Sequence, residues 1–199
     1  MQQDLQRCGP GYCCIIGDSI TEAAPLAAVD GRGPINAGIG GARVADALRL
    51  ILPTLEGTRP AALLLAIGVN DTKREVPEPP AQRLADFARD YQALVRGARQ
   101  LTPHVGLVAI GPVAKGTQFV EFGDNFFDPA LIVAFNNTIA TIAAEMDVPL
   151  QSLAGLAGAD GLALPDVTDD GVHLSAAGYA IWNAAIAHAW QTVMPVDAV

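Results

Sequence analysis

The chain has 199 residues, of which 51% are hydrophobic, and its 12 basic and 21 acidic residues give a net charge of −9. This length is typical of one folded domain with a sizeable core, and we expect a single domain over residues 1–199. A surface that binds nucleic acid or an anionic membrane needs clustered cations, whereas the basic residues here are few and scattered. The composition therefore argues against both kinds of partner.

The first residues of the chain lack the features of an export signal. Residues 1–8 are polar and contain no apolar run after a basic start. No apolar stretch approaches the length of about 20 residues that spans a bilayer. We therefore expect no transmembrane segment and take the cytoplasm as the default location, with secretion or periplasmic export as alternatives. Cys8, Cys13 and Cys14 lie near the first strand, where we expect buried thiols and no disulfide framework.

Apolar blocks of strand length alternate with longer segments of helical period, which is typical of a parallel sheet crossed by helices. In chain order the sequence predicts strands at 11–17 and 34–37, a helix at 42–55, a strand at 61–67, a loop at 70–80, a helix at 81–101, a strand at 105–110, a helix at 129–146, a strand at 149–153 and a helix at 175–192. Right-handed crossovers between five such strands predict a three-layer α/β/α architecture, and we favour the strand order 2-1-3-4-5.

Polar segments follow several of the predicted strands. The first strand breaks into Gly17-Asp18-Ser19, which delivers a serine hydroxyl to the carboxyl edge of the sheet, where open α/β sheets bind their ligands. Residues 36–41 and 68–71 follow the next two strands, and residues 170–173 precede the last helix. We expect all four segments to meet at one edge.

These residue types suit acyl transfer. A serine hydroxyl is a weak nucleophile that needs an imidazole to accept its proton, and a carboxylate fixes the correct tautomer of that imidazole. Asp170 and His173 are three residues apart and can meet without help from distant parts of the chain. The backbone N–H of Gly41, unobstructed by a Cβ, and the side-chain amide of Asn70 are candidate donors to an oxyanion.

The four segments together resemble the sequence blocks of the SGNH hydrolases, the GDSL-type esterases and lipases. The blocks are Gly17-Asp18-Ser19-Ile20 with Thr21, Asn36-x-Gly38-x-x-Gly41, Gly68-x-Asn70-Asp71 and Asp170-x-x-His173, in the family's order within residues 15–178. The resemblance implies a flavodoxin-like sheet and hydrolysis of esters or thioesters with no metal and no organic cofactor. By position it implies Ser19 as nucleophile, His173 as base and Asp170 as its orienter. It also implies an oxyanion hole formed by the N–H groups of Ser19 and Gly41 and by the Asn70 side chain.

The sequence departs from common versions of the family pattern after the serine block. The glycine often found there is absent, and Glu22-Ala23-Ala24-Pro25 follows Thr21, which affects the expected pocket wall more than the chemistry. Gly40 competes with Gly41 for the donor role. We prefer Gly41 because it lies five residues after Asn36.

Each of these polar residues also has a structural interpretation. Ser19 and Asp18 are common helix N-caps, and Asn70 could instead cap a helix or form a turn. We expect Asp71 to be structural, because short aspartate side chains often bind nearby backbone groups.

Other acidic and imidazole groups are candidates for the same roles. Asp169 is the alternative to Asp170 as the orienter of His173. His104 and His188 have no such carboxylate partner in the sequence, and we assign both to structure.

The segment 117–128 carries the aromatic residues Phe119, Phe122, Phe126 and Phe127. Long loops with aromatic residues in compact domains often serve as lids or binding walls. We predict a substrate wall at this segment; the alternative is that the rings pack the loop onto the core.

We therefore predict a serine hydrolase that cleaves small to medium acyl esters through an acyl-enzyme on Ser19. A carboxylesterase or a carbohydrate O-acetylesterase is the first choice, with a small-molecule or glycan ester as substrate. A lysophospholipase or thioesterase is the alternative for longer acyl chains. A ligand-binding module without catalysis is the alternative from another class, and the intact set of Ser19, Asp170 and His173 argues against it.

Overall fold

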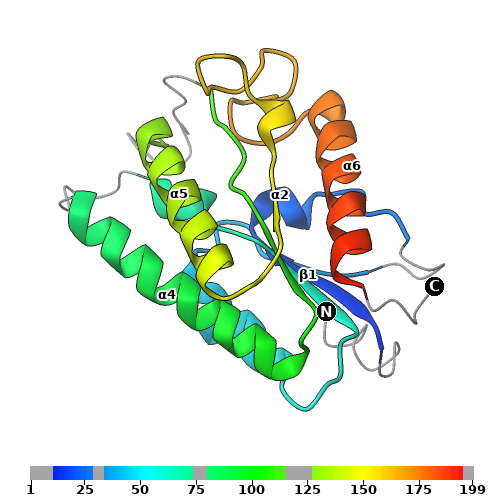
Figure 1. The fold of residues 1–199 in the computed structure, drawn as a ribbon. Helices are drawn as coiled ribbons and strands as arrows, with labels where there is room; N and C mark the ends of the chain where they lie inside the picture. The colour runs from blue at the N-terminus through cyan, green and yellow to red at the C-terminus, as the bar shows by residue number, and fades with distance from the viewer. Residues whose placement is uncertain (1–10, 29–33, 74–79, 115–126, 195–199) are drawn as a thin grey trace.

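The computed structural model describes residues 11–28, 34–73, 80–114 and 127–194, in which helices cover both faces of a central sheet (Figure 1). The sheet has five parallel strands in the order β2-β1-β3-β4-β5, which confirms the predicted order and the flavodoxin-like architecture. The strands are β1 (Cys13–Gly17), β2 (Ile35–Gly38), β3 (Ala62–Ala66), β4 (Val105–Val108) and β5 (Leu150–Gln151).

The helical segments lie between and after these strands. They are α2 (Ser19–Glu22), α3 (Val44–Asp46), η1 (Ala47–Ile51), η2 (Leu52–Leu55), η3 (Val69–Thr72), α4 (Pro80–Leu101), α5 (Pro129–Glu145), η5 (Ala154–Leu156) and α6 (Ala176–Val193). Ser175 is the N-cap of α6, as predicted, and its side chain accepts the N–H of Gly178. Within the described ranges, no helix combines the length and the apolar character needed to cross a membrane.

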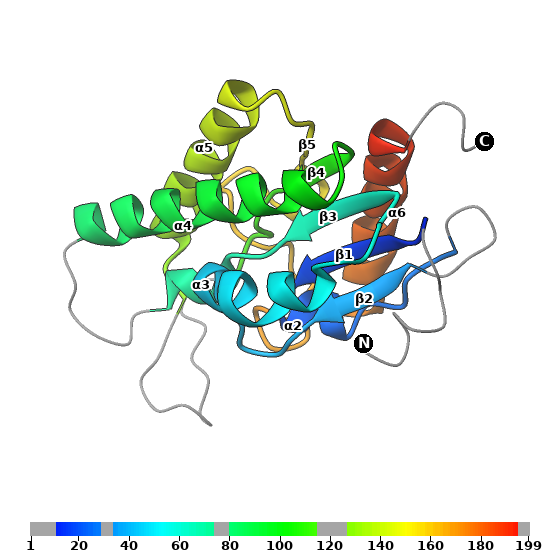
Figure 2. The ribbon, with the colours of Figure 1, turned by 90° about the horizontal axis from the view of Figure 1, so that it is seen from below.

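Alternate residues of a strand point to opposite faces of the sheet. In β1, Cys14 and Ile16 join the core cluster under α4 and α5, whereas Cys13 and Ile15 join the cluster under α6. Figure 2 shows the strands between α4 on one side and α6 on the other. Because both faces are covered, the central strands are apolar without alternation, as in the run at residues 61–67.

The predicted helix over residues 42–55 is helical from Val44, but it is not one regular α-helix. A short α-helical turn passes into a π-helical turn, in which the N–H of Leu52 donates to the carbonyl of Ala47. A 3-10 turn containing Pro53 then ends the segment. Proline has no N–H to donate, and its ring would crowd the carbonyl four residues earlier in a regular α-helix. The local pitch therefore changes while the apolar side chains stay on the sheet.

The strand order places a topological switch point beside β1. The chain leaves β1 for β2 on one side and then crosses to β3 on the other side of β1. Ligands of open α/β sheets bind at such a point, outside the carboxyl ends of the strands. Ser19 lies there, directly after β1.

The close contact between α6 and the segment before it gives a test of the packing. A Cβ on Gly178 would lie 2.1 Å from the carbonyl oxygen of Val167, a backbone atom that cannot move freely. Gly178→Ala should therefore lower the free energy of unfolding by about 1 kcal/mol or more, although alanine is the better helix former. Gly111→Ala is the matched control, since its Cβ would have no neighbour closer than 3.8 Å. Equal urea midpoints for the two variants would contradict this packing.

Candidate active site

Ser19 begins α2, and the residue between it and β1 is the buried Asp18. The Asp18 side chain caps α2 by accepting the N–H of Ile20 at 3.1 Å. It also accepts hydrogen bonds from the backbone of Gly68 and Val69, which follow β3. Burial raises the pKa of Asp18 to about 6, although these hydrogen bonds act to lower it. The carboxyl group thus joins the serine turn to the loop after β3.

Two side chains from other elements hold α2 from outside. The hydroxyl of Tyr179, on α6, donates to the carbonyl oxygen of Ile20 at 2.8 Å. The side-chain amide of Asn36, on β2, donates to the carbonyl oxygen of Thr21 at 2.7 Å. Asn36 therefore tethers α2 to β2.

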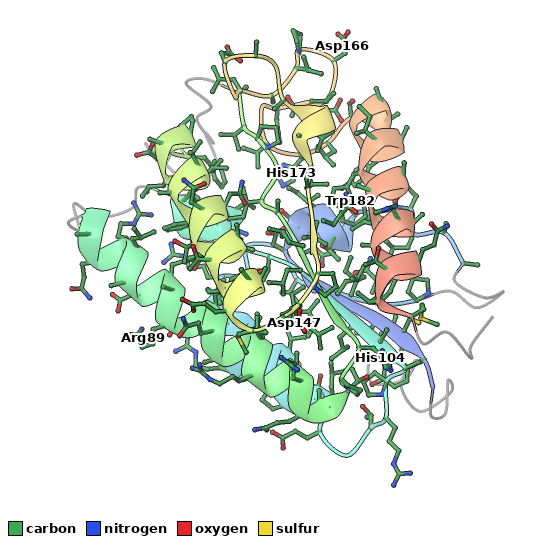
Figure 3. The ribbon with its side chains drawn as sticks, in the orientation of Figure 1. Arg89, His104, Asp147, Asp166, His173 and Trp182 are labelled. Atoms are coloured by element: carbon green, nitrogen blue, oxygen red, sulfur yellow. The ribbon has the colours of Figure 1, made fainter. Side chains whose placement is uncertain are left out.

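The imidazole of His173 lies between the hydroxyl of Ser19 and the carboxylate of Asp170. Nε2 of His173 is 3.0 Å from Oγ of Ser19, and Nδ1 is 2.6 Å from Oδ2 of Asp170. When Nδ1 carries the proton, it donates to Asp170 and leaves Nε2 free to accept the serine proton. In Figure 3, His173 lies beside α2, whereas His104 lies at the opposite edge of the sheet.

The Asp170 carboxylate is fixed in its own segment. Its Oδ1 accepts the backbone N–H groups of Val172 at 2.9 Å and His173 at 2.8 Å. Although partial burial acts to raise it, the hydrogen bonds from His173 and Val172 hold the pKa of Asp170 below its ordinary value. The alternative orienter, Asp169, meets His173 through its backbone, since its N–H donates to the carbonyl of His173 at 3.0 Å.

The two remaining histidines lie elsewhere. His104 precedes β4, at the amino end of the sheet. Nδ1 of His188, on α6, is 2.8 Å from Oε1 of Gln151 on β5. Neither ring belongs to the Ser19 site.

Asn70 and Gly41 lie on the two loops that follow β3 and β2. Asn70 is 3% exposed, and its Nδ2 donates one N–H to the carbonyl of Ala42 at 3.0 Å. A primary amide has a second N–H, which a ligand oxygen could accept. Gly41 is exposed and has φ +75°, a conformation that favours glycine. A Cβ on Gly41 would meet no protein atom within 4 Å, so within the protein it is the backbone conformation that favours glycine here.

The same two loops are joined a second time through Asp71. Oδ2 of Asp71 accepts the N–H of Val44 at 3.2 Å, a structural role of the kind predicted for this residue. Arg83 of α4 then donates to the carbonyl oxygens of Asp71 and Lys73, both at 2.6 Å. Burial of the Asp71 carboxyl raises its pKa to about 7, against the lowering effect of the Val44 hydrogen bond.

Of the four phenylalanines predicted to form a substrate wall, Phe119, Phe122 and Phe126 lie outside the described residues. Phe127 is 3% exposed and belongs to the core cluster under α4 and α5. Its backbone pairs with that of Lys73, and Nζ of Lys73 lies 5.3 Å from the ring centroid. Phe127 itself therefore packs onto the core, as in the alternative interpretation, and is not part of the site.

Sequence reasoning missed the tethers made by Asp18, Tyr179 and Arg83. The position of Asp18 directly before a helix start predicts a capping role. Its partners after β3 are distant in sequence, and no local pattern indicates them. Arg83 could have been noticed from its position in the first turn of α4. A cation there interacts unfavourably with the helix dipole, which suggests that it binds a specific acceptor. In the described part of the chain, no group of three or more His, Cys, Asp or Glu residues could hold a metal ion.

The two buried carboxyls make stability depend on pH. Their raised pKa values mean that the native protein keeps protons that the unfolded chain releases near pH 4, so the native state loses stability as pH rises through about 6 and 7. From pH 5 to pH 8, Asp71 alone should reduce the free energy of unfolding by about 1–3 kcal/mol. Asp71→Asn has no proton to lose and should show a smaller decline in urea unfolding at the two pH values. A decline as large as that of the wild type would contradict this assignment.

Comparisons with solved structures find the same fold. They include a GDSL-like lipase from Bacteroides thetaiotaomicron with 20% identity, a TM-score of 0.73 and 96% of both chains covered. An acetyl xylan esterase from Geobacillus stearothermophilus has 19% identity and a TM-score of 0.66, with 91% of this chain and 95% of that chain covered. A lipase/acylhydrolase from Enterococcus faecalis has 18% identity and a TM-score of 0.66, with 93% and 97% covered. No curated protein matches the chain.

The family comparison covers most of the sequence. The model of the GDSL-like Lipase/Acylhydrolase family matches residues 15–181, a range that includes all four sequence blocks and every side chain of the hydrogen-bonded series at Ser19. The chain therefore belongs to the GDSL-like Lipase/Acylhydrolase family.

Proposed function

We propose that the protein is a serine hydrolase that cleaves acyl esters through an acyl-enzyme on Ser19. The observation that carries this proposal is the hydrogen-bonded series from Oγ of Ser19 to His173 and on to Asp170, with distances of 3.0 and 2.6 Å. A hydroxyl, an imidazole and a carboxylate in this order are the arrangement that activates a serine. Membership of an acylhydrolase family supports the same chemistry.

The reaction begins when Nε2 of His173 takes the proton of Ser19 as Oγ attacks the ester carbonyl carbon. The imidazolium that forms is stabilised by the Asp170 carboxylate, which already lies on Nδ1. His173 then returns the proton to the departing alcohol oxygen, and the acyl group remains on Ser19. Water, deprotonated by the same imidazole, attacks the acyl-enzyme, and the carboxylic acid leaves as Oγ regains its proton.

The negative charge of the tetrahedral intermediate needs fixed donors. Ser19 begins α2, and the first N–H groups of a helix have no acceptor within the helix. The N–H of Gly41 and the second N–H of the Asn70 amide complete the proposed oxyanion hole. Asn70 is well suited to this role because burial and its bond to Ala42 fix the amide before substrate arrives.

For the substrate we propose a small to medium acyl ester, with a carboxylesterase or a carbohydrate O-acetylesterase as the activity. Two of the structural neighbours are acetyl xylan esterases, which supports an acetyl group on a carbohydrate. The chemistry uses groups of the chain itself, and no cofactor enters any step.

Hydrolysis of p-nitrophenyl esters from acetate to palmitate tests the proposal. Ser19→Ala should lower kcat/KM by about 10⁴-fold or more, because it removes the nucleophile and leaves only binding and the oxyanion donors. A rate maximum at acetate would agree with deacetylation. A maximum at eight carbons or beyond would instead indicate that lipids or thioesters are the substrates. Retained activity in folded Ser19→Ala would remove the mechanism.

The neighbouring aspartates provide a matched pair of variants. Asp170→Asn should reduce kcat by about 10²–10⁴-fold, since an amide no longer holds the tautomer that leaves Nε2 ready to accept a proton. Asp169→Asn makes the same chemical change one residue away and should leave kcat within about twofold of the wild type. Equal losses in the two variants would refute the assignment of Asp170 as the orienter.

A further inference from the structure

Glu22 lies on the same short helix as the proposed nucleophile, and it has no role in the proposed mechanism. It ends α2, three residues after Ser19, and residues at this spacing lie on one face of a helical turn. Its carboxylate lies over the glycine loop after β2, because Oε2 is 2.9 Å from the position of a Cβ on Gly40. Glu22 and Gly40 are both exposed. Gly41, a proposed oxyanion donor, is the residue after Gly40, so the carboxylate lies close to the proposed oxyanion hole.

The backbone around Glu22 fixes where its side chain begins. A Cβ on Gly38 would lie 2.3 Å from the backbone nitrogen of Glu22, so the end of α2 and the glycine loop pack backbone against backbone. The Asn36 side chain holds the same end of α2 through the carbonyl of Thr21 at 2.7 Å and that of Glu22 at 3.3 Å. The Glu22 side chain therefore extends from a backbone that is held in place.

The two cations that follow the glycine loop and η3, Arg43 and Lys73, interact with other groups. Arg43 acts on Asp71, where its charge lowers the pKa of that carboxyl. Lys73 lies over the ring of Phe127. Among the described residues no ion pair involves Glu22, and its carboxylate is exposed beside Gly40.

We propose that Glu22 determines substrate specificity, by binding a hydroxyl or a cationic ammonium group of the ester and by repelling a carboxylate at the same place. This inference rests on the proposed function, because it needs an ester bound at Ser19. A carboxylate accepts a hydrogen bond from a hydroxyl, and its charge attracts a cation, including a quaternary ammonium group that has no N–H to donate. A solvent-exposed charge near a bound group should change kcat/KM by about three- to tenfold.

The test measures kcat/KM for pairs of esters that have the same shape but differ in charge. Acetylcholine and 3,3-dimethylbutyl acetate place the charge on the alcohol, and betaine ethyl ester and ethyl 3,3-dimethylbutanoate place it on the acyl group. The readout is the value of kcat/KM for the cationic ester divided by that for the neutral ester of the same pair. This ratio cancels differences in overall rate between enzyme variants. In Glu22→Gln this ratio should fall about three- to tenfold in at least one pair, and that pair identifies the side of the ester that Glu22 contacts.

Three comparisons isolate the charge of Glu22. Glu145→Gln removes the same charge at the end of α5, at the opposite edge of the sheet, and should leave both ratios unchanged. Glu22→Lys should reverse the preference in the pair that responds to Glu22→Gln. In the wild type, the preference should weaken as salt rises from 20 to 500 mM, over which the Debye length falls from roughly 20 to roughly 4 Å.

The hydroxyl is tested separately from the charge. Ethylene glycol monoacetate has a hydroxyl where propyl acetate has a methyl group. Glu22→Ala should lower the ratio of kcat/KM for the hydroxyl ester to kcat/KM for propyl acetate. Glu22→Gln keeps an acceptor and should lower this ratio less. Ratios that are the same in the wild type, Glu22→Gln and Glu22→Ala for every pair would overturn this inference, even if Ser19→Ala is inactive. Hydrolysis that survives in Ser19→Ala would instead overturn the proposed function.

Discussion

The contact between Oγ of Ser19 and Nε2 of His173 joins two segments that are 154 residues apart in the chain, and the proposed chemistry depends on it. The sheet makes this contact possible because β1, at the switch point of the strand order, ends where the segment before α6 returns. Tyr179 stabilises this contact, because its hydrogen bond to Ile20 links α6 to α2. A distance of 3.0 Å allows direct proton transfer, and a small shift of either segment would break it.

Around this contact, buried polar groups fix the loops that carry the proposed oxyanion donors. Asp18 ties the serine turn to the loop after β3, and Asn70 and Asp71 tie that loop to the one after β2. Burying carboxyls is unfavourable, which is why the pKa values of Asp18 and Asp71 are raised. Such a network fixes donors before substrate arrives, and preorganised donors are the main source of oxyanion stabilisation. The stability lost by this burial is thus connected to the proposed function of the site.

Much of the fold and of the candidate site could be predicted from sequence, because both follow from local patterns. Apolar runs that end in polar residues located the strands and their common edge, and Asp170 and His173 lie close enough in sequence to be paired. The π-helical turn at Ala47–Ile51 depends on how one proline interrupts a helix, and periodicity does not show this. The two-residue length of β5 depends on its single neighbour at the sheet edge. The tether made by Tyr179 joins residues 159 apart and has no local signature.

Covalent trapping tests the central claim most directly. A fluorophosphonate reacts with an activated serine, and intact mass followed by peptide mapping identifies the labelled residue. We expect one adduct per chain, located on Ser19, that forms much more slowly in His173→Ala while that variant remains folded. An adduct on another residue, or labelling of Ser19 at the same rate in His173→Ala, would contradict the proposed activation of Ser19 by His173.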